Sequence, residues 1–166
     1  NPGLAVNATN EQFLDTFQRH LLANHALVQA TIGGMKAAGY GRIVNVISTS
    51  VKEPIRNLGV SNTIRGAVAN WAKTLAGELA AHGITVNNVL PGFTRTQRLE
   101  QIIEERVAAT GKTRADIEAG MLSSVPAARF AEAHEVAAAI AFLASPAAGY
   151  INGINVPVDG GRTQSL

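Results

Sequence analysis

Apolar residues recur every three or four positions along the first forty residues, which is the spacing of one face of a helix. Thr9 and Gln12 are placed to form a capping box, in which each side chain binds the other residue's backbone N–H at a helix start. We therefore predict a helix that begins after Thr9 and continues to Gly39. Its apolar face comprises Phe13, Phe17, Leu21, Leu27, Val28, Ile32 and Met35.

The same spacing predicts four more helices. One ends at His82, and the following Gly83 suits the left-handed conformation that terminates many helices. Its apolar face comprises Ala67, Val68, Trp71, Leu75 and Leu79. Two helices are predicted over residues 98–109 and 114–121, and another amphipathic helix over residues 132–143.

Three short runs rich in β-branched residues predict strands, over residues 42–47, 84–90 and 154–158. Long helices separate these strands, so the strands are expected to pair in parallel through right-handed crossovers. The sequence therefore predicts one α/β domain over residues 1–166, built on an open parallel sheet.

A parallel sheet of three strands is unusually narrow, because parallel sheets are normally several strands wide and covered on both faces. The strand over residues 42–47 would expose one edge unless another strand or a subunit covers it. The chain also opens on Asn1-Pro2-Gly3, without an initiating Met. We expect an N-terminal half of the fold to be absent from this sequence.

Composition narrows the class of protein. Hydrophobic residues make up 46% of the 166 residues and charged residues 16%, as in soluble globular proteins. The net charge of +2 is small and its Lys and Arg are scattered, so neither nucleic acid nor a membrane is an expected partner. The sequence has no Cys, which excludes disulfides and thiolate metal sites; no metal site is expected, and a cytoplasmic location is the default expectation.

Four segments carry recognisable motifs. Residues 41–48 are a strand that ends in a serine, and residues 67–79 form the helix after it. Residues 83–96 are a strand, a Pro-Gly turn and Thr-x-Thr, and residues 152–161 end on Val-Asp-Gly-Gly. In this order they resemble the active-site strand, the active-site helix, the turn beside the nicotinamide and the C-terminal signature of the short-chain dehydrogenase/reductase family.

The resemblance implies a fold and an activity. The fold would be the C-terminal part of a Rossmann-type doubly wound parallel sheet, with the Gly-rich pyrophosphate turn lying in the absent N-terminal half. Family members interconvert a carbonyl and an alcohol by hydride transfer with NADP or NAD. In them a Tyr exchanges the proton, a Ser holds the substrate oxygen, a Lys binds the ribose and lowers the Tyr pKa, and an Asn completes the proton relay.

Ser48 matches the catalytic Ser, although a loop hydroxyl that satisfies a nearby backbone group is the alternative. The usual Tyr is Ser61 and the usual Lys is Arg65. A Ser hydroxyl is a much weaker acid than a Tyr hydroxyl, so the standard relay is not expected. Arg65 keeps its proton, and its guanidinium is expected to hold ribose hydroxyls and negative charge on oxygen.

The Asn position falls on His20, a residue type that moves protons near neutral pH. The alternative for His20 is an ordinary helix histidine that faces solvent or a subunit. Pro91, Gly92, Thr94 and Thr96 match the turn that contacts the nicotinamide and the cofactor phosphates.

Overall similarity to 3-oxoacyl-carrier-protein reductases implies a small ketone or β-ketoacyl substrate. It also implies a homo-oligomer, a dimer or tetramer, formed through helices near residues 11–36 and 60–82. Two alternatives stay open at this point. One is a non-catalytic family member that binds a nucleotide or a partner, and the other is a fragment that binds no dinucleotide in the usual way.

Overall fold

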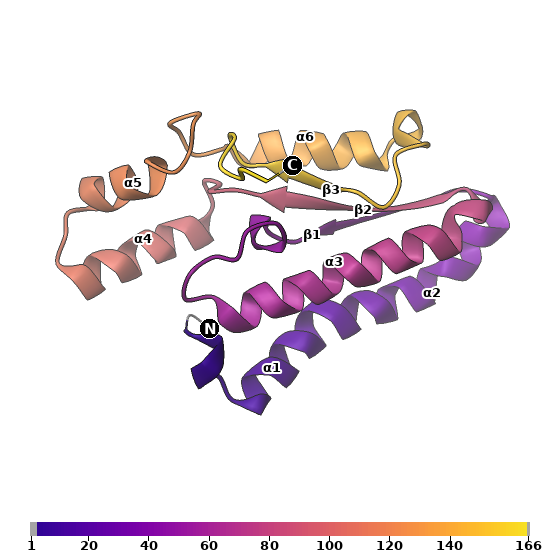
Figure 1. Cartoon of the computed structure of the whole chain (residues 1–166). Helices are drawn as coiled ribbons and strands as arrows, with labels where there is room; N and C mark the ends of the chain where they lie inside the picture. The colour runs from indigo at the N-terminus through magenta and orange to yellow at the C-terminus, as the bar shows by residue number, and fades with distance from the viewer. Residues whose placement is uncertain (1–2, 166) are drawn as a thin grey trace.

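A computed structural model describes residues 3–165 and shows a three-stranded parallel sheet, in the order β1-β2-β3 (Figure 1). The strands are β1 (Gly41–Val46), β2 (Ile84–Pro91) and β3 (Asn155–Val158). β1 and β2 align Gly41 with Ile84, and β2 and β3 align Asn88 with Asn155. The predicted α/β class, strand positions and parallel pairing are confirmed.

Helices cover both faces of the sheet. One layer contains α1 (Asn10–Phe17), α2 (Ala23–Ala38) and α3 (Gly59–Leu79), and the opposite layer contains α6 (Ala133–Ala144) (Figure 1). Side chains alternate between the two faces of β2, as the pleat of a strand requires. Ile84 and Val86 pack with α3, whereas Val89 packs with α6.

An amide ladder crosses the sheet. The buried Asn45 side chain donates from Nδ2 to Oδ1 of Asn88 at 2.9 Å, and Asn88 Nδ2 donates to Oδ1 of Asn155 at 2.8 Å. Asn88 is only 3% exposed, so these bonds satisfy polar groups that water does not reach. The ladder links all three strands at one level.

The helix expected from Thr9 to Gly39 is present but contains a π-helical stretch, Gln18–Leu22, between α1 and α2. The Thr9–Gln12 capping box is confirmed. Gly39 and Gly83 both adopt left-handed conformations, with φ of 60° and 71°. A Cβ on Gly83 would lie 2.3 Å from the carbonyl oxygen of Gly39, so this close backbone contact also requires glycine.

Two helices, α4 (Gln97–Thr110) and α5 (Arg114–Leu122), form an arm beyond the end of the sheet (Figure 1). Thr96 and Thr113 cap their N-termini through side-chain oxygens. A separate core cluster joins the two helices, and it comprises Leu99, Ile103, Ile117, Met121 and Phe130. Four short 3-10 turns complete the described elements: Ala5–Asn7, Thr49–Val51, Ala80–His82 and Pro146–Ala148.

One edge of the sheet carries no partner strand within residues 3–165, because β1 pairs only with β2 there. Val46, at the end of β1, is half exposed. Over the same residues, every helix is too short or too polar to cross a bilayer.

Candidate active site

Three of the four candidate catalytic residues line one cavity of about 800 Å³, namely His20, Ser61 and Arg65. The cavity lies where α1 and the π-helical stretch, the N-terminal half of α3, and α4 face one another (Figure 1). Ser61 and Arg65 are four residues apart on α3, so helix geometry places them on one face. The structure thus brings together residues that lie more than forty positions apart in the sequence.

A side chain on α3 holds the loop that precedes this helix in place. Asn62 Nδ2 donates to the backbone oxygen of Ile55 at 2.8 Å, and Asn62 Oδ1 accepts from the Ile55 N–H at 3.4 Å. Ile55 lines the same cavity as Ser61. The loop wall of the cavity is therefore held in place by the residue next to Ser61.

Burial and nearby positive charge, including that of Arg65, act on the His20 imidazole. Burial, and then the positive charges of Arg65 and Arg19, hold the pKa of His20 below its ordinary value, while Asp15 opposes this shift. The imidazole is therefore mainly neutral at neutral pH. Burial also lowers the pKa of Arg65, but a guanidinium keeps its proton in proteins. The pair combines a titratable group with a permanent cation.

Ser48, the fourth candidate, is outside the residues that line this cavity. It is half-buried after β1, and its Oγ accepts from the backbone N–H of Ser50 at 3.1 Å, where it caps the turn Thr49–Val51. This is the backbone role that the sequence left open as an alternative. The bond uses a lone pair of Oγ, so the hydroxyl proton remains able to bind another acceptor.

The four candidate cofactor residues of the Pro-Gly turn line a second cavity of about 400 Å³: Pro91, Gly92, Thr94 and Thr96. Apolar side chains including Val46, Ile47 and Leu99 form most of the remaining wall, and Arg98 also lines it. An apolar wall with a few hydroxyl groups fits the flat nicotinamide ring and its polar carboxamide. The cavity also lies at the carboxyl end of β2, where open α/β sheets bind ligands.

The turn residues have structural roles as well. Thr94 Oγ1 donates to the Gly92 backbone oxygen at 3.2 Å, and Thr96 Oγ1 accepts from the Leu99 N–H at 3.3 Å. A Cβ on Gly92 would lie 2.7 Å from the Cα of Asp159. Glycine at this position is thus needed for packing of the chain, whatever else the turn binds.

Comparison with known proteins identifies the family. A family model described as Enoyl-(Acyl carrier protein) reductase matches residues 1–163, almost the whole chain. The chain belongs to the short-chain dehydrogenase/reductase family. The expected fold is thereby confirmed as the Rossmann-type sheet of this family.

Relatives of this short-chain dehydrogenase/reductase chain are reductases. The 3-oxoacyl-[acyl-carrier-protein] reductase FabG of Haemophilus influenzae is 38% identical over 160 residues, which cover 95% of this chain and 61% of FabG. The NADPH-dependent reductase BacG of Bacillus subtilis is 33% identical over 165 residues, which cover 99% of this chain and 64% of BacG. The chain therefore spans somewhat more than 60% of the length of these relatives.

Solved structures of the family superimpose closely on this chain. YwfH, a NADPH-dependent reductase involved in bacilysin biosynthesis, has a TM-score of 0.93 at 32% identity, covering 100% of this chain and 64% of YwfH. L-sorbose reductase from Gluconobacter frateurii, solved with NADPH and L-sorbose, also has a TM-score of 0.93, at 27% identity. The match covers 100% of this chain and 64% of the L-sorbose reductase chain.

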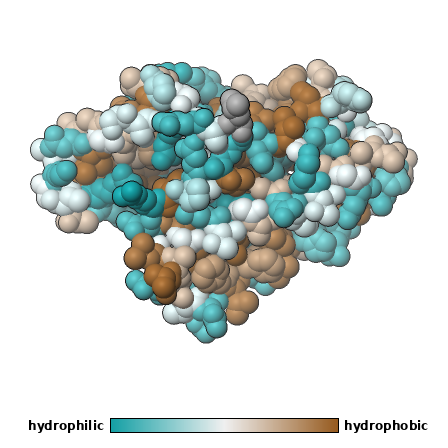
Figure 2. Space-filling view, viewed as in Figure 1, coloured by the Kyte–Doolittle hydropathy of each residue, from teal (hydrophilic) through white to brown (hydrophobic). Residues whose placement is uncertain are grey.

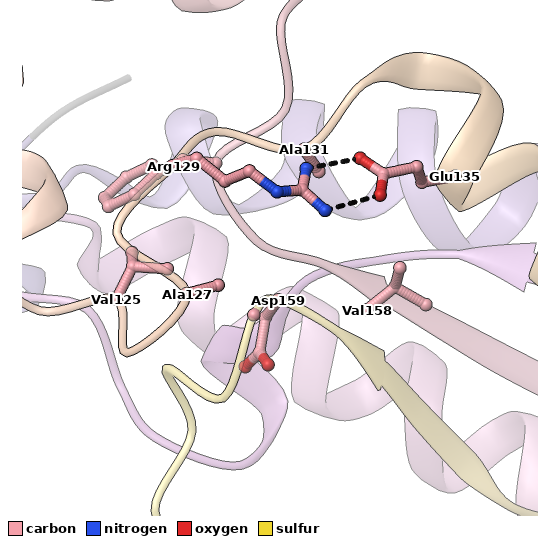
Figure 3. Close-up of a pocket in the computed structure, with 9 residues that line it drawn as sticks. Val125, Ala127, Arg129, Ala131, Glu135, Val158 and Asp159 are labelled. Atoms are coloured by element: carbon pink, nitrogen blue, oxygen red, sulfur yellow. Dashed lines mark hydrogen bonds and ion pairs between the residues drawn. The ribbon is translucent and has the colours of Figure 1, made fainter.

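Asp159 of the C-terminal family signature lines a small cavity together with the Arg129–Glu135 ion pair (Figure 3), and its carboxylate has a structural task. Asp159 accepts from the backbone N–H groups of Gly161 and Thr163, at 3.1 and 2.8 Å. Beside it, the Arg129 guanidinium donates to both carboxylate oxygens of Glu135 at 2.7 Å and lowers the pKa of Glu135 to about 2. These contacts surround a small cavity of about 80 Å³ next to Gly160.

Four arginines that line the larger cavity were not among the residues expected from the sequence: Arg19, Arg56, Arg98 and Arg106. A signal for two of them existed, because Arg98, Ile102 and Arg106 recur every four residues on α4 and so share one face. Arg56 lies in an irregular loop, where the spacing of residues in the sequence does not indicate which way a side chain points. Arg98 and Ile102 line both cavities, so the two sites are neighbours.

Proposed function

We propose that this protein is an NAD(P)-dependent oxidoreductase that interconverts a carbonyl and an alcohol by hydride transfer, with a non-standard proton relay. The observation that carries the proposal is the shared cavity of His20, Ser61 and Arg65. By the sequence resemblance these residues match the family's proton-relay positions, and their cavity neighbours the cavity of the Pro-Gly turn, which would hold a nicotinamide. The reductase relatives support the same class of reaction.

The cofactor is proposed to be NADP or NAD. Pro91, Gly92, Thr94 and Thr96 would hold its nicotinamide end, and Arg65 would bind ribose hydroxyls through its planar guanidinium. When bound, the nicotinamide supplies or takes up the hydride. NADP is favoured over NAD only by analogy with the NADPH-dependent relatives.

The protein's own residues would manage charge and proton. During carbonyl reduction negative charge grows on the substrate oxygen, and the guanidinium of Arg65 would stabilise that charge. The hydroxyl groups of Ser48 and Ser61 would donate hydrogen bonds to the same oxygen. The proton that completes the alcohol would come from the His20 imidazolium, which becomes neutral; in alcohol oxidation neutral His20 would accept it.

Histidine is chemically suited to exchange this proton, whereas serine is not. The pKa of a Ser hydroxyl lies far above that of a Tyr, so Ser61 holds its proton too tightly to act alone. The lowered pKa of His20 makes its imidazolium a stronger acid and leaves the neutral base abundant at neutral pH. Both directions of proton transfer are thus accessible to one side chain.

The replaced Tyr and Lys also favour a second candidate, a non-catalytic member of the family that binds a nucleotide or a partner. The two candidates differ in turnover. We would incubate the full-length protein, as its gene encodes it, with NADPH or NADH and a panel of aldehydes and ketones, and follow loss of the reduced cofactor. Turnover by the natural protein supports the oxidoreductase; turnover only after Ser61→Tyr and Arg65→Lys together supports the non-catalytic protein.

Self-association is part of the proposal. Leu14, Leu22 and Leu27 on the α1–α2 layer are exposed by 67%, 38% and 65%. Figure 2 shows hydrophobic residues gathered over the lower part of the molecule, where α1 and α2 run. Trp71 and Leu75 are instead half-buried against the core. We propose a homo-oligomer, and a monomeric mass in light scattering would contradict it.

A further inference from the structure

The larger cavity carries more positive than negative charge. Five guanidinium groups line it, on Arg19, Arg56, Arg65, Arg98 and Arg106, against only two carboxylates. Asp15 pairs with Arg19 at 2.8 Å, and Glu105 lies 3.7 Å from Arg98. Within residues 3–165, no carboxylate lies within ion-pair distance of the remaining three, which are Arg56, Arg65 and Arg106.

This excess is local. The whole chain has a net charge of only +2, so three unpaired guanidinium groups in one cavity are not a consequence of a basic protein. Arg65 is partly withdrawn from water, and a desolvated cation is costly unless an anion or a hydrogen-bond acceptor compensates it. Arg56 and Arg106 are exposed, so their guanidinium groups are accessible to a ligand that enters from solvent. The cavity, at about 800 Å³, has the volume of a small-molecule site.

We infer that the substrate is a small carbonyl compound with a carboxylate or phosphate group, and that Arg56 and Arg106 bind this anionic group. The inference rests on the proposed oxidoreductase function. Guanidinium groups bind carboxylates and phosphates through two parallel hydrogen bonds, which fixes orientation as well as affinity. An anchored anionic end would direct the carbonyl toward Ser61, Arg65 and His20 on the other wall.

Arg56 and Arg106 lie apart from the proposed cofactor contacts of the Pro-Gly turn, although they share the larger cavity with Arg65. They do not line the cavity of the Pro-Gly turn. They do line an adjoining cavity of about 430 Å³, together with Arg162. Glu53 is the one carboxylate among the residues that line this adjoining cavity, so the cavity also carries more positive than negative charge. We therefore assign Arg56 and Arg106 to the anionic group of the substrate, and Arg65 to the cofactor and the reacting oxygen.

The test uses matched pairs of compounds with the full-length protein and NADPH. Acetoacetate is compared with methyl acetoacetate, and dihydroxyacetone phosphate with dihydroxyacetone, so that each pair differs by one anionic group. We expect the anionic member of at least one pair to have the lower KM. The pair that shows the preference distinguishes a carboxylate from a phosphate.

The variants Arg56→Gln and Arg106→Gln, singly and together, should remove that preference. Loss of a charged hydrogen bond costs about 1.5–3 kcal/mol, so each change should raise KM for the anionic compound by roughly tenfold or more. KM for the neutral partner and the Kd for NADPH should stay the same. Lys36→Gln, which removes an exposed charge at the far end of α2, is the control and should change nothing.

Equal KM values within both pairs would overturn the inference while leaving the proposed function intact. A weaker NADPH complex in the Arg56 and Arg106 variants, with unchanged discrimination between the compounds, would also overturn it. If no compound is turned over, calorimetric titration with acetoacetate and dihydroxyacetone phosphate shows whether the anionic compounds still bind. Arginine-dependent binding without turnover would support the anion site and refute the proposed function, whereas neither binding nor turnover would refute both.

Discussion

The guanidinium of Arg65 holds the pKa of His20 below its ordinary value, from across the cavity between α3 and the π-helical stretch. Burial of the imidazole is the larger cause, and the charge of Arg65 adds to it. We propose that the two residues occupy the family's Lys and Asn positions. In this proposal a permanent cation and a titratable imidazole take the places of a charged Lys and an uncharged Asn.

Removing the charge of Arg65 should raise the pKa of His20. The Arg65→Gln variant removes one of the two positive charges that disfavour the imidazolium, so the shift is upward. NMR titration of the His20 ring protons measures it. Arg65→Lys keeps the charge and should leave the His20 pKa nearly unchanged; the same titration midpoint in both variants would show that the two residues do not interact.

The stability of the protein should depend on His20 as pH falls. The pKa of His20 is lower in the folded state, so the unfolded chain binds more protons between the two pKa values. The contribution of His20 is therefore fully present above the ordinary pKa and is lost as pH falls through it. Urea denaturation from pH 7.5 to about 5 should show a smaller loss of stability in His20→Gln than in the natural protein. Parallel losses in the two proteins would contradict this.

The amide ladder should contribute strongly to the sheet. Asn88→Ala leaves the buried Asn45 Nδ2 and the half-buried Asn155 Oδ1 without their partner. An unsatisfied buried group costs about 1–3 kcal/mol and Asn155 keeps partial access to water, so the free energy of unfolding should fall by about 1–3 kcal/mol. Chemical denaturation measures the change. Asn70→Ala, an exposed position on α3, is the control, and an equal effect of the two substitutions would refute the role of the ladder.

Gly83 should not tolerate a side chain. Its φ is 71° and a Cβ would meet the Gly39 carbonyl oxygen, so Gly83→Ala should lower the melting temperature through a loss of about 1–3 kcal/mol. Gly77, in the interior of α3, has open space around its missing Cβ. Gly77→Ala should instead stabilise the helix by about 0.5–1 kcal/mol. Similar effects of the two changes would show that the turn at Gly83 is not constrained.

Much of the fold follows from local patterns. The capping box at Thr9, the left-handed Gly83 and the three β-branched runs each indicate their element without tertiary information. The π-helical stretch Gln18–Leu22 was not predicted, because its apolar spacing continues that of an ordinary helix. That β1 lies at the edge of the sheet depends on which strands pair with each other, and the sequence pattern gives strand pairing only indirectly.

The site was harder to predict than the fold. Motif positions brought out His20, Ser61 and Arg65, and the structure places them in one cavity. Ser48 matches its motif position in the sequence, yet it is not among the residues that line that cavity and its Oγ caps a turn, which only the path of the loop reveals. The charge balance of the cavity depends on which arginines already have carboxylate partners, and pairing across elements is invisible in a linear sequence.

The proposed function requires that His20 exchange the proton in the hydride-transfer reaction. We would measure kcat for alcohol oxidation with NADP as a function of pH, in the natural protein and in His20→Gln. We expect a rate that rises with pH to a plateau, with a midpoint below the ordinary histidine pKa, because neutral His20 accepts the proton. In His20→Gln this transition should disappear and kcat should fall about 10²-fold or more. An unchanged rate and pH profile in His20→Gln would contradict the claim.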